Sequence, residues 1–319
     1  MSIISTDISK AVKLLSNEDL VAIPTETVYG LAGNIYSEKA IKAIFETKQR
    51  PLFNPLIVHI PSVEYLETIV EDIPKKAQLL ADAFWPGPIT LVLKKKATIP
   101  DLITAGKDTV AMRMPNHPVT LKLLSELDFP LAAPSANPFN RISPTTAQHV
   151  ENYFKDAIKM VLEGGSCERG IESTIIGFEN GEPIIYRLGS TSIEAIEEVV
   201  GKIEIKNKKE VAPDAPGMLE RHYAPTTKTI LTGNLIDSIE AHKNLRIGLL
   251  TYNDFLDDDV IDFKIVLSEH NNLEEAASKL YDALHQLDKQ ELDIIIAEKL
   301  PDYGLGKSIN DRLLRASKS

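Results

Sequence analysis

One stretch near the start of the chain, residues 21–60, constrains the fold more than any other segment. It reads VAIPTETVYGLAGNIYSEKAIKAIFETKQRPLFNPLIVHI. Two short apolar runs, Leu20–Ile23 and Leu56–Ile60, are typical of buried strands. Between them, Ser37 is placed to cap a helix whose apolar residues recur at i, i+3 and i+4, and Pro51 is placed to end it. The stretch therefore predicts a βαβ unit.

Polar groups gather where these predicted elements end. Thr25–Thr27 follow the first strand, and His59 lies in the second. Lys48 and Arg50 stand two apart as the chain leaves the helix. Because α/β sheets tend to bind ligands at the carboxyl ends of their strands, we expect these groups to share one edge of a sheet. Hydroxyls with a Lys-x-Arg pair suit a polyanion such as a nucleotide tail, although such pairs are more often solvated and a strand histidine more often belongs to the core.

A further predicted strand, Thr109–Pro115, carries a candidate carboxylate clamp. Its side chains alternate, so Val110 and Met112 share one face while Ala111 and Arg113 share the other. A guanidinium holds a carboxylate through two parallel hydrogen bonds, which makes Arg113 the candidate. The alternative for Arg113 is an ion pair on the surface.

Small and hydroxyl-bearing residues follow in the segment from Leu131 onward. LAAPSAN, residues 131–137, is a small-residue strand end and loop, where a ligand can approach the backbone closely. Ser143 precedes Pro144 and the helix-like TTAQHVENYF, so we expect it to cap that helix, and a free helix N-terminus also binds phosphate. Cys167, the single cysteine, excludes an internal disulfide and any multi-cysteine metal site.

These motifs together resemble one family. PTETVYGLAG followed by K-x-R-P and N-P-L resembles the YrdC-like domain of L-threonylcarbamoyladenylate synthases. R-M-P at Arg113, S-x-N at Ser135 and Asn137, and the string that begins at Gly170 match the same family. APGMLERHYAP, residues 215–225, matches the connector of its long, two-domain form. The resemblance therefore covers almost the whole chain.

The expected fold is α/β with two domains. The resemblance implies a YrdC-like catalytic domain over residues 1–205, with a twisted mixed sheet around an open cavity. It also implies a connector over residues 206–228 that closes over the active site as a lid. From residue 229 to 319, strands alternate with helices and predict a small Rossmann-like domain with a parallel sheet. GLGKSIND at 304–311 is not a P-loop, because the position that needs the first glycine is Pro301.

The resemblance also implies which residues bind each substrate. Lys48 and Arg50 would be catalytic and would bind ATP. L-threonine would be bound by Thr27, His59, Arg113, the backbone of Ala133, and Ser173. The remaining ATP-binding residues would be Asn54, Thr109, Ser135, Asn137, Ser143, Arg187 and Tyr223.

The implied reaction joins L-threonine, bicarbonate and ATP into L-threonylcarbamoyladenylate and releases pyrophosphate. The product feeds threonylcarbamoyl modification of the adenosine beside the tRNA anticodon, through a downstream tRNA threonylcarbamoyl transferase machinery. Mg²⁺ would enter with ATP and be held mainly by its phosphates, without a protein metal site. The sequence offers no convincing general base, so orientation and electrostatic stabilisation are expected to suffice.

Composition bounds the remaining possibilities. The 319 residues carry a formal net charge of -11, which disfavours broad nucleic-acid binding. An RNA-binding module is thus the weaker alternative. A hydrogenase-maturation carbamoyl transferase, which uses a related domain, would need zinc-finger cysteines that a chain with one cysteine lacks. No apolar run approaches membrane-spanning length and the first residues lack a signal core, so we expect no membrane binding and a cytoplasmic location.

Overall fold

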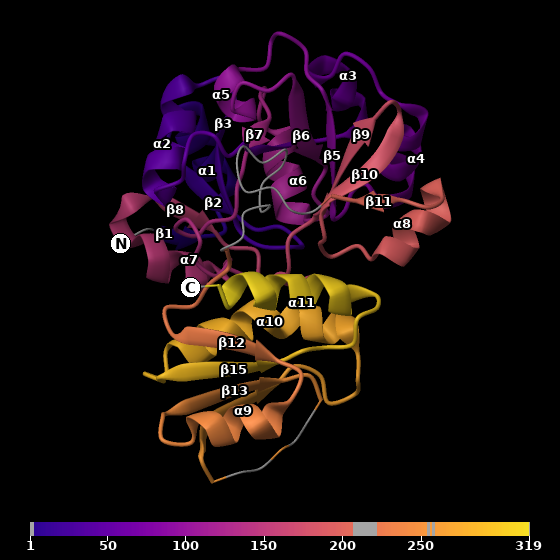
Figure 1. Cartoon of the computed structure of the whole chain (residues 1–319). Coiled ribbons are helices and arrows are strands. Elements are labelled where there is room, and N and C mark those ends of the chain that lie inside the picture. Colours follow the sequence, from indigo (N-terminus) through magenta and orange to yellow (C-terminus); the bar gives the residue numbers. More distant parts are fainter. Residues whose placement is uncertain (1–2, 207–221, 254–255, 257–258, 319) are drawn as a thin grey trace.

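The computed structural model describes residues 3–206, 222–253, 256 and 259–318. Its strands form two sheets, an eleven-stranded mixed sheet within residues 3–205 and a four-stranded parallel sheet within residues 228–298. Figure 1 shows the two domains stacked, with the helices α10 (Leu273–Asp288) and α11 (Leu305–Ala316) of the smaller domain facing the larger one. The two-domain α/β fold predicted from the sequence is confirmed.

The large sheet has the strand order β1-β8-β2-β3-β7-β4-β6-β5-β9-β10-β11. Its strands are β1 Ile3–Ser5, β2 Val21–Ile23, β3 Gly30–Asn34, β4 Ile57–His59, β5 Ile89–Lys94, β6 Thr109–Arg113, β7 Leu131–Ala132, β8 Met160–Leu162, β9 Thr174–Glu179, β10 Glu182–Arg187 and β11 Glu204–Ile205. The helices of this domain are α1 Ile8–Ser16, α2 Glu38–Lys48, α3 Leu66–Ile69, α4 Lys75–Phe84, α5 Asp101–Thr104, α6 Pro118–Ser125, α7 Ala147–Phe154 and α8 Ile193–Val200, with 3-10 turns at Val63–Tyr65 and Lys155–Ala157.

The predicted βαβ unit is wrong in one respect. GLAGN, residues 30–34, forms β3, which pairs antiparallel with β2 before α2 begins. β7 then lies between β3 and β4 and is antiparallel to both. Glycine and alanine have low strand propensity, which is why the pattern gave no strand signal there. Because antiparallel neighbours send strand ends to both edges, the ligand-facing groups collect on a face of the sheet and not along one edge.

The start and the end of α2 follow from local chemistry. Ser37 caps the helix by accepting a hydrogen bond from the backbone N–H of Ala40, as predicted. The helix ends at Lys48 and not at Pro51, because Gln49 adopts a left-handed conformation with φ of 53°. Lys48 is therefore the last helical residue, while Arg50 already lies in the following loop.

The two faces of the large sheet are used differently. One face packs into the main core against α2 and α4, and it includes Val58, Met112 and Ala132. On the other face, α1 and α6 cover the part of the sheet around β2 and β8. The remainder of that face, over β4, β6 and β9, carries a small apolar cluster that includes Ile57 and Ala111. The pocket described below lies on this part of the face.

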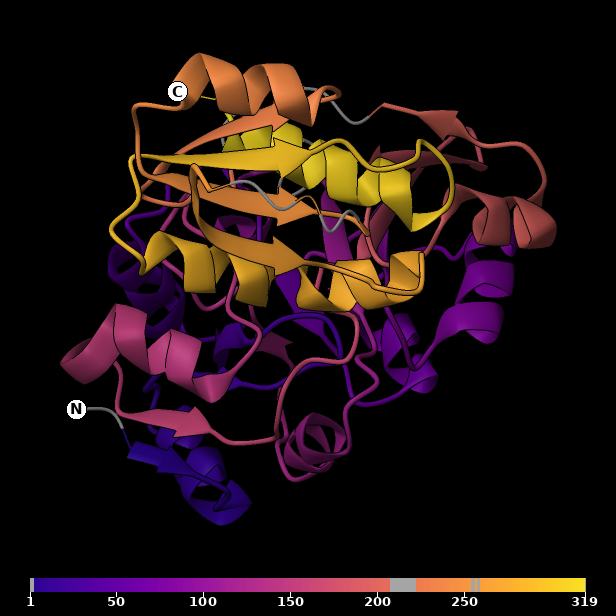
Figure 2. The same cartoon turned by 90° about the horizontal axis from the view of Figure 1, so that it is seen from below.

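The smaller domain has an all-parallel sheet in the order β12-β15-β13-β14, as Figure 2 shows by its four arrows that point the same way. Its strands are β12 Lys228–Thr232, β13 Ile247–Thr251, β14 Ile261–Val266 and β15 Ile294–Glu298, and α9 is Leu235–His242. The predicted parallel domain is confirmed. Among the residues described, no helix combines the length and the apolar character needed to cross a membrane.

The two domains share one apolar core. Val28, Ile142 and Ile171 of the catalytic domain pack in the same buried cluster as the apolar face of α10, which includes Leu280 and Leu284. Tyr223, from the end of the connector, belongs to this cluster as well. The junction is therefore packed like a protein interior and is more than the meeting of two tethered domains.

Candidate functional site

A pocket opens on the face of the large sheet that carries Ile57 and Ala111. Its lining comes from the turn after β2 and the start of β3, the loop after α2, the strands β4 and β6 with the loop after β7, the segment around β9 and β10, and the end of the connector. Its lining residues are Thr25, Thr27, Val28, Gly30, Arg50, Ile57, His59, Arg113, Ala133, Pro134, Ser135, Glu172, Ser173, Arg187, His222 and Tyr223. The pocket thus brings together every residue predicted to bind threonine and part of the set predicted to bind ATP.

At one end of the pocket, strand register places Arg113 beside His59. The two residues are direct neighbours across the parallel pair β4 and β6. The Arg113 guanidinium lies 2.5 Å from the Glu26 carboxylate and also donates to Thr27 Oγ1 at 2.8 Å. Its Nε donates to the carbonyl oxygen of Gly87. Both charged side chains are only 4% exposed, so the alternative of a surface ion pair is wrong.

His59 is a neutral imidazole at physiological pH. Burial, reinforced by the nearby Arg113, lowers the pKa of His59 to about 3. Its Nδ1 atom has no hydrogen-bond partner among the described residues. A neutral ring both donates and accepts hydrogen bonds, so His59 suits a small polar ligand held next to the Arg113 guanidinium.

At the other end, two buried guanidiniums line the pocket. Arg50 donates to the carbonyl oxygens of Asn54 and Pro55, at 3.3 and 2.8 Å, and Arg187 donates to the carbonyl oxygen of Ser173. Burial, together with repulsion from Arg187, lowers the pKa of Arg50 to about 9. Like charges forced together in a buried site favour an anionic ligand, because the ligand relieves their repulsion.

Lys48 lies behind this wall and does not line the pocket. It is buried, and its Nζ donates to the carbonyl oxygens of Ser135, at 2.5 Å, and Asn137. Burial and the proximity of Arg50 lower its pKa well below the ordinary value for lysine. The K-x-R and S-x-N parts of the sequence signature, 85 residues apart, are therefore joined through one ammonium group.

Four more residues predicted for ATP lie outside the pocket lining: Asn54, Thr109, Asn137 and Ser143. Asn54 is fully buried, and neither atom of its amide has a partner among the described residues. Asn137 donates to the carbonyl oxygens of Pro138 and Arg141. Thr109 begins β6 on the same face as Arg113 and borders a neighbouring hollow that also includes Tyr186.

Ser143 does not cap the following helix, so that expectation is wrong. Thr146 is the N-cap of α7 and accepts from the backbone N–H of His149. The helix begins only at Ala147, so Pro144 and Thr145 lie before it. The Ser143 hydroxyl is thereby free to donate to the Glu172 carboxylate.

Tyr223 of the connector lines the pocket on the side that faces the C-terminal domain. It is 1% exposed, and its ring stacks on Tyr281 of α10 at 5.8 Å while the Arg312 guanidinium lies 4.7 Å above it. His222 meets its ring edge-on. Most of the predicted lid, residues 207–221, lies outside the described residues.

The sequence did not single out two carboxylates that matter here. Glu26 pairs with Arg113, and Glu172 lines the pocket next to Ser173. Both stand inside the strings that carried the resemblance, so their position beside Thr27 and Ser173 was the available signal. Tyr281 and Arg312, which contact Glu172, gave no signal because they come from helices more than 100 residues further along the chain.

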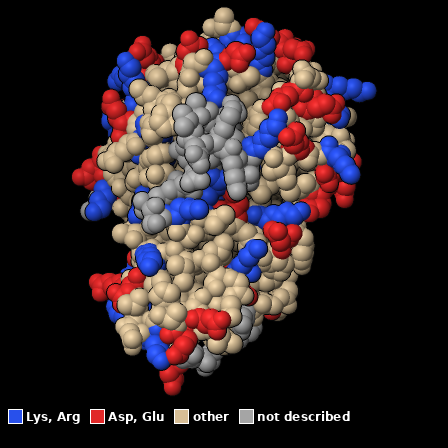
Figure 3. All heavy atoms as spheres, viewed as in Figure 1, with Lys and Arg blue, Asp and Glu red and all other residues tan. Residues whose placement is uncertain are grey.

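Charge on the surface is mixed. On the face shown in Figure 3, acidic and basic side chains are interspersed, and several Lys and Arg side chains gather along the junction between the domains. Within the described ranges, no group of three or more His, Cys, Asp or Glu side chains is arranged to hold a metal ion.

Comparison with known proteins matches both domains. Residues 13–189 match the family model Sua5_yciO_yrdC, described as "Telomere recombination". Residues 191–318 match Sua5_C, described as "Threonylcarbamoyl-AMP synthase, C-terminal domain". The second match favours a synthase over the hydrogenase-maturation alternative, which needs other domains.

Similar proteins cover the chain from end to end. The threonylcarbamoyl-AMP synthase of Pyrococcus abyssi is 40% identical, over 93% of this chain and 90% of that relative. The Bacillus subtilis threonylcarbamoyl-AMP synthase is 39% identical, over 97% of this chain and 92% of that relative. The crystal structure of P. abyssi Sua5 complexed with L-threonine superposes with a TM-score of 0.92 at 38% identity, and the match covers 99% of this chain and 98% of that one.

Proposed function

The chain belongs to the Sua5-type threonylcarbamoyl-AMP synthases, and we propose that the pocket described above holds L-threonine at the Arg113 end and ATP at the Arg50 and Arg187 end. It is a nucleotidyltransferase that makes threonylcarbamoyl-AMP for threonylcarbamoyl modification of tRNA. One observation supports the assignment of the two ends of the pocket to different substrates. A guanidinium balanced by a carboxylate lies at one end, and two guanidiniums that repel each other lie at the other.

The threonine end suits an amino acid. Arg113 binds the substrate carboxylate through its guanidinium, with Glu26 and Thr27 holding that group in orientation. His59 and the Ser173 hydroxyl, which is 2.7 Å from Thr90 Oγ1, supply polar contacts for the side chain and amine. The N–H of Ala133 already donates to the carbonyl oxygen of Ile57, which leaves the Ala133 carbonyl oxygen as its contact to the substrate. The relative from P. abyssi that is described as complexed with L-threonine supports this assignment.

The nucleotide end suits a polyphosphate. Arg50 and Arg187 contact phosphate oxygens, and Lys48 holds the loop that presents Ser135 and Asn137. The hydroxyl of Ser143 and the amide of Asn54 border this end, and Tyr223 packs against the nucleotide. Thr109 lies further along the pocket-facing side of β6, where the base extends past the apolar cluster that includes Ile57 and Ala111. The boundaries 1–205, 206–228 and 229–319 for the domains and the connector belong to this proposal.

The chemistry follows from this arrangement. The threonine amine takes up carbon dioxide, derived from bicarbonate, as a carbamate. A carbamate oxygen then forms a bond to the α-phosphorus, the bond from that phosphorus to the bridging oxygen breaks, and pyrophosphate leaves. His59, with a pKa of about 3, is a weak base, so catalysis depends on orientation and on charge stabilisation by Lys48 and Arg50.

Mg²⁺ fits this end of the pocket as a companion of ATP. The groups there are mostly guanidiniums and hydroxyls, which contact phosphate oxygens, and the Glu172 carboxylate is engaged by Arg312 and Tyr281. We therefore expect the phosphates to hold Mg²⁺, which would neutralise part of their charge. The product passes to the tRNA threonylcarbamoyl transferase step in the cytoplasm, and we expect no stable binding of nucleic acid.

Substrate-dependent pyrophosphate release tests the function. The purified chain is incubated with ATP, Mg²⁺, bicarbonate and each amino acid in turn, and pyrophosphate is measured. Release should require L-threonine and bicarbonate together. Equal turnover with serine, or turnover in bicarbonate-free buffer, would contradict the assignment.

A further inference from the structure

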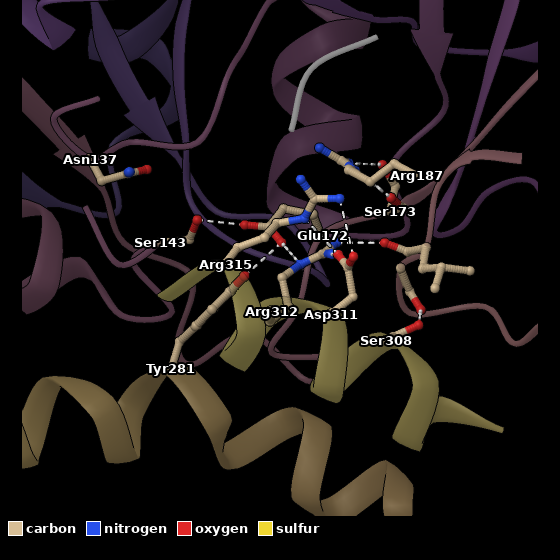
Figure 4. A network of polar contacts seen from close by, with 12 residues as sticks. Asn137, Ser143, Glu172, Ser173, Arg187, Tyr281, Ser308, Asp311, Arg312 and Arg315 are labelled. Carbon is tan, nitrogen blue, oxygen red and sulfur yellow. Dashed lines mark hydrogen bonds and ion pairs between the residues drawn. The ribbon is translucent and has the colours of Figure 1, made fainter. Parts of the chain in front are cut away.

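Two side chains of the C-terminal domain contact a carboxylate that lines the pocket. Tyr281 from α10 and Arg312 from α11 are fully buried, and Figure 4 shows both pointing at Glu172. The Tyr281 hydroxyl donates to Glu172 Oε2 at 2.8 Å, and Arg312 Nε donates to the same oxygen at 3.0 Å. Glu172 itself lines the pocket. A carboxylate of one domain is therefore held by the other domain.

Glu172 also connects to Ser143 and Arg187 of the nucleotide end. Its other oxygen, Oε1, accepts the hydrogen bond of the Ser143 hydroxyl. The next residue in the chain, Ser173, accepts hydrogen bonds from Arg187 at its carbonyl oxygen and at its hydroxyl. One carboxylate thus connects the two C-terminal side chains to Ser143, Ser173 and Arg187.

Glu172 is ionised. Burial opposes its charge, but Arg312 and Arg187, with the hydrogen bonds from Ser143 and Tyr281, outweigh burial and lower its pKa. Its negative charge also offsets part of the repulsion among the buried cations of the pocket. A change at Arg312 therefore reaches the nucleotide end through charge as well as through position.

Further contacts from the same helices fix the flanks of these residues. Arg312 Nη2 donates to the carbonyl oxygen of Leu188 at 2.6 Å, and the Ser308 hydroxyl donates to that of Gly189 at 2.8 Å. His285 Nε2 lies 3.2 Å from the carbonyl oxygen of Ser143. The segment after Arg187 and the backbone of Ser143 are therefore also bound to the C-terminal domain.

The loop that carries Glu172 has no room to shift. Gly170 has a φ of 69°, and a Cβ there would lie 2.3 Å from the carbonyl oxygen of Ser278 in α10. On the opposite side, a Cβ at Gly189 would lie 2.3 Å from the backbone of Ser173. The loop from Gly170 to Ser173 is thus packed closely between α10 and the segment that follows β10. A shift of α10 would therefore move this loop as well.

Stabilisation of the domain interface does not by itself explain the buried ion pair between Arg312 and Glu172. The shared apolar core already binds them, and a buried ion pair costs desolvation that its attraction only partly returns. What the pair adds is a fixed position for a charged group inside the pocket.

We propose that Arg312 and Tyr281 are positioning residues for the nucleotide end of the site, acting through Glu172 on Ser143 and, by way of the backbone carbonyl of Ser173, on Arg187. The C-terminal domain is then a working part of the active site. This inference rests on the assignment of that end to ATP made above.

Kinetics of three variants and a matched control test it. The variants are Tyr281→Phe, Arg312→Lys and Glu172→Gln, and the control is Lys307→Ala. Lys307 forms another ion pair across the domains, at 2.9 Å with Glu194, but does not contact Glu172. Pyrophosphate release is measured with ATP and with threonine as the varied substrate, and the thermal midpoint is measured for every variant.

Tyr281→Phe and Arg312→Lys should raise KM for ATP or lower kcat by roughly 3- to 10-fold, the effect of one lost hydrogen bond, with KM for threonine changed less than 2-fold. Lys307→Ala should leave both constants unchanged. In a Glu172→Gln background, Tyr281→Phe should have a smaller further effect, because a hydrogen bond to a neutral amide oxygen is weaker than one to a carboxylate.

Two results separate the two proposals. The positioning role is overturned if the activity losses of Tyr281→Phe and Arg312→Lys are the same with and without the Glu172 carboxylate. It is also overturned if these losses only track a fall in the thermal midpoint. If the losses depend on Glu172 but fall on KM for threonine, the coupling stands and the assignment of this end to ATP fails.

Discussion

The two ends of the pocket are built in different ways. At the threonine end, Arg113 and His59 stand side by side on neighbouring strands, and Glu26 balances the guanidinium within the same domain. At the nucleotide end, Arg50 and Arg187 come from a loop and a strand end, and Arg312 of the C-terminal domain holds the lining residue Glu172. The first end is local and neutral overall, whereas the second carries excess positive charge and spans both domains.

This difference matches the charge of the two substrates. A zwitterionic amino acid offers one carboxylate, so a single oriented guanidinium that is neutralised in the free protein suffices. A triphosphate needs several cations, and their mutual repulsion makes the free site costly and the occupied site favourable. Four measurements would break or sharpen this contrast, and they follow from the largest expected effect to the smallest.

Glu26→Gln should have the largest effect, and it should act on stability. It leaves Arg113 charged and buried beside a neutral partner, which lowers the free energy of unfolding by roughly 3–5 kcal/mol. Urea unfolding measures the change, with Glu38→Gln in the exposed pair with Lys42 as the control, which should unfold like the parent. A loss no greater than in the control would show that the threonine end is not held by this pair.

Arg50→Ala should weaken ATP binding by roughly 100-fold, about 3 kcal/mol, because a charged hydrogen-bond donor to phosphate is lost. Threonine affinity should stay within a factor of two. Isothermal titration calorimetry with each substrate gives both values. A loss shared equally between the substrates would mean that the two ends are not separate.

Arg113→Lys should show the opposite selectivity and a smaller effect. Lysine keeps the charge but loses the fork that contacts Glu26, Thr27 and the substrate, so threonine affinity should fall by about 2 kcal/mol. ATP affinity should hold. Calorimetry that instead shows ATP affinity falling while threonine affinity holds would reverse the assignment of the two ends.

The pH dependence of binding is the most gradual of the four effects. Burial lowers the pKa values of Lys48 and Arg50 in the free protein, and a polyanion favours their charged forms. ATP should therefore bind with proton uptake, and its affinity should fall as pH rises through the lowered pKa values, by at most about 1.4 kcal/mol per unit for one proton. Calorimetry in two buffers of different ionisation enthalpy measures the uptake. Threonine, which meets a balanced ion pair, should show none, and equal uptake for both substrates would remove the contrast.

Much of the fold could be predicted because its signals are local. Ser37 correctly predicted the start of α2, and the alternation of strands and helices after residue 229 correctly predicted the parallel sheet of the smaller domain. β3 was missed because its small residues have weak strand propensity, and its antiparallel pairing with β2 moved the binding groups from an edge to a face. Ser143 was misjudged because a cap motif is read from neighbours in sequence, whereas its partner Glu172 is 29 residues away.

The sequence by itself determined the list of residue types in the pocket and the order of the elements that carry them. Only the tertiary structure decided that Lys48 holds the loop of Ser135 and Asn137 from behind, that Glu26 balances Arg113, and that Arg312 reaches Glu172 from the other domain. Side-chain periodicity fixes which face a residue takes, but ion pairing depends on distances between segments far apart in the chain. Those distances are set by packing of the whole core, and so no local pattern records them.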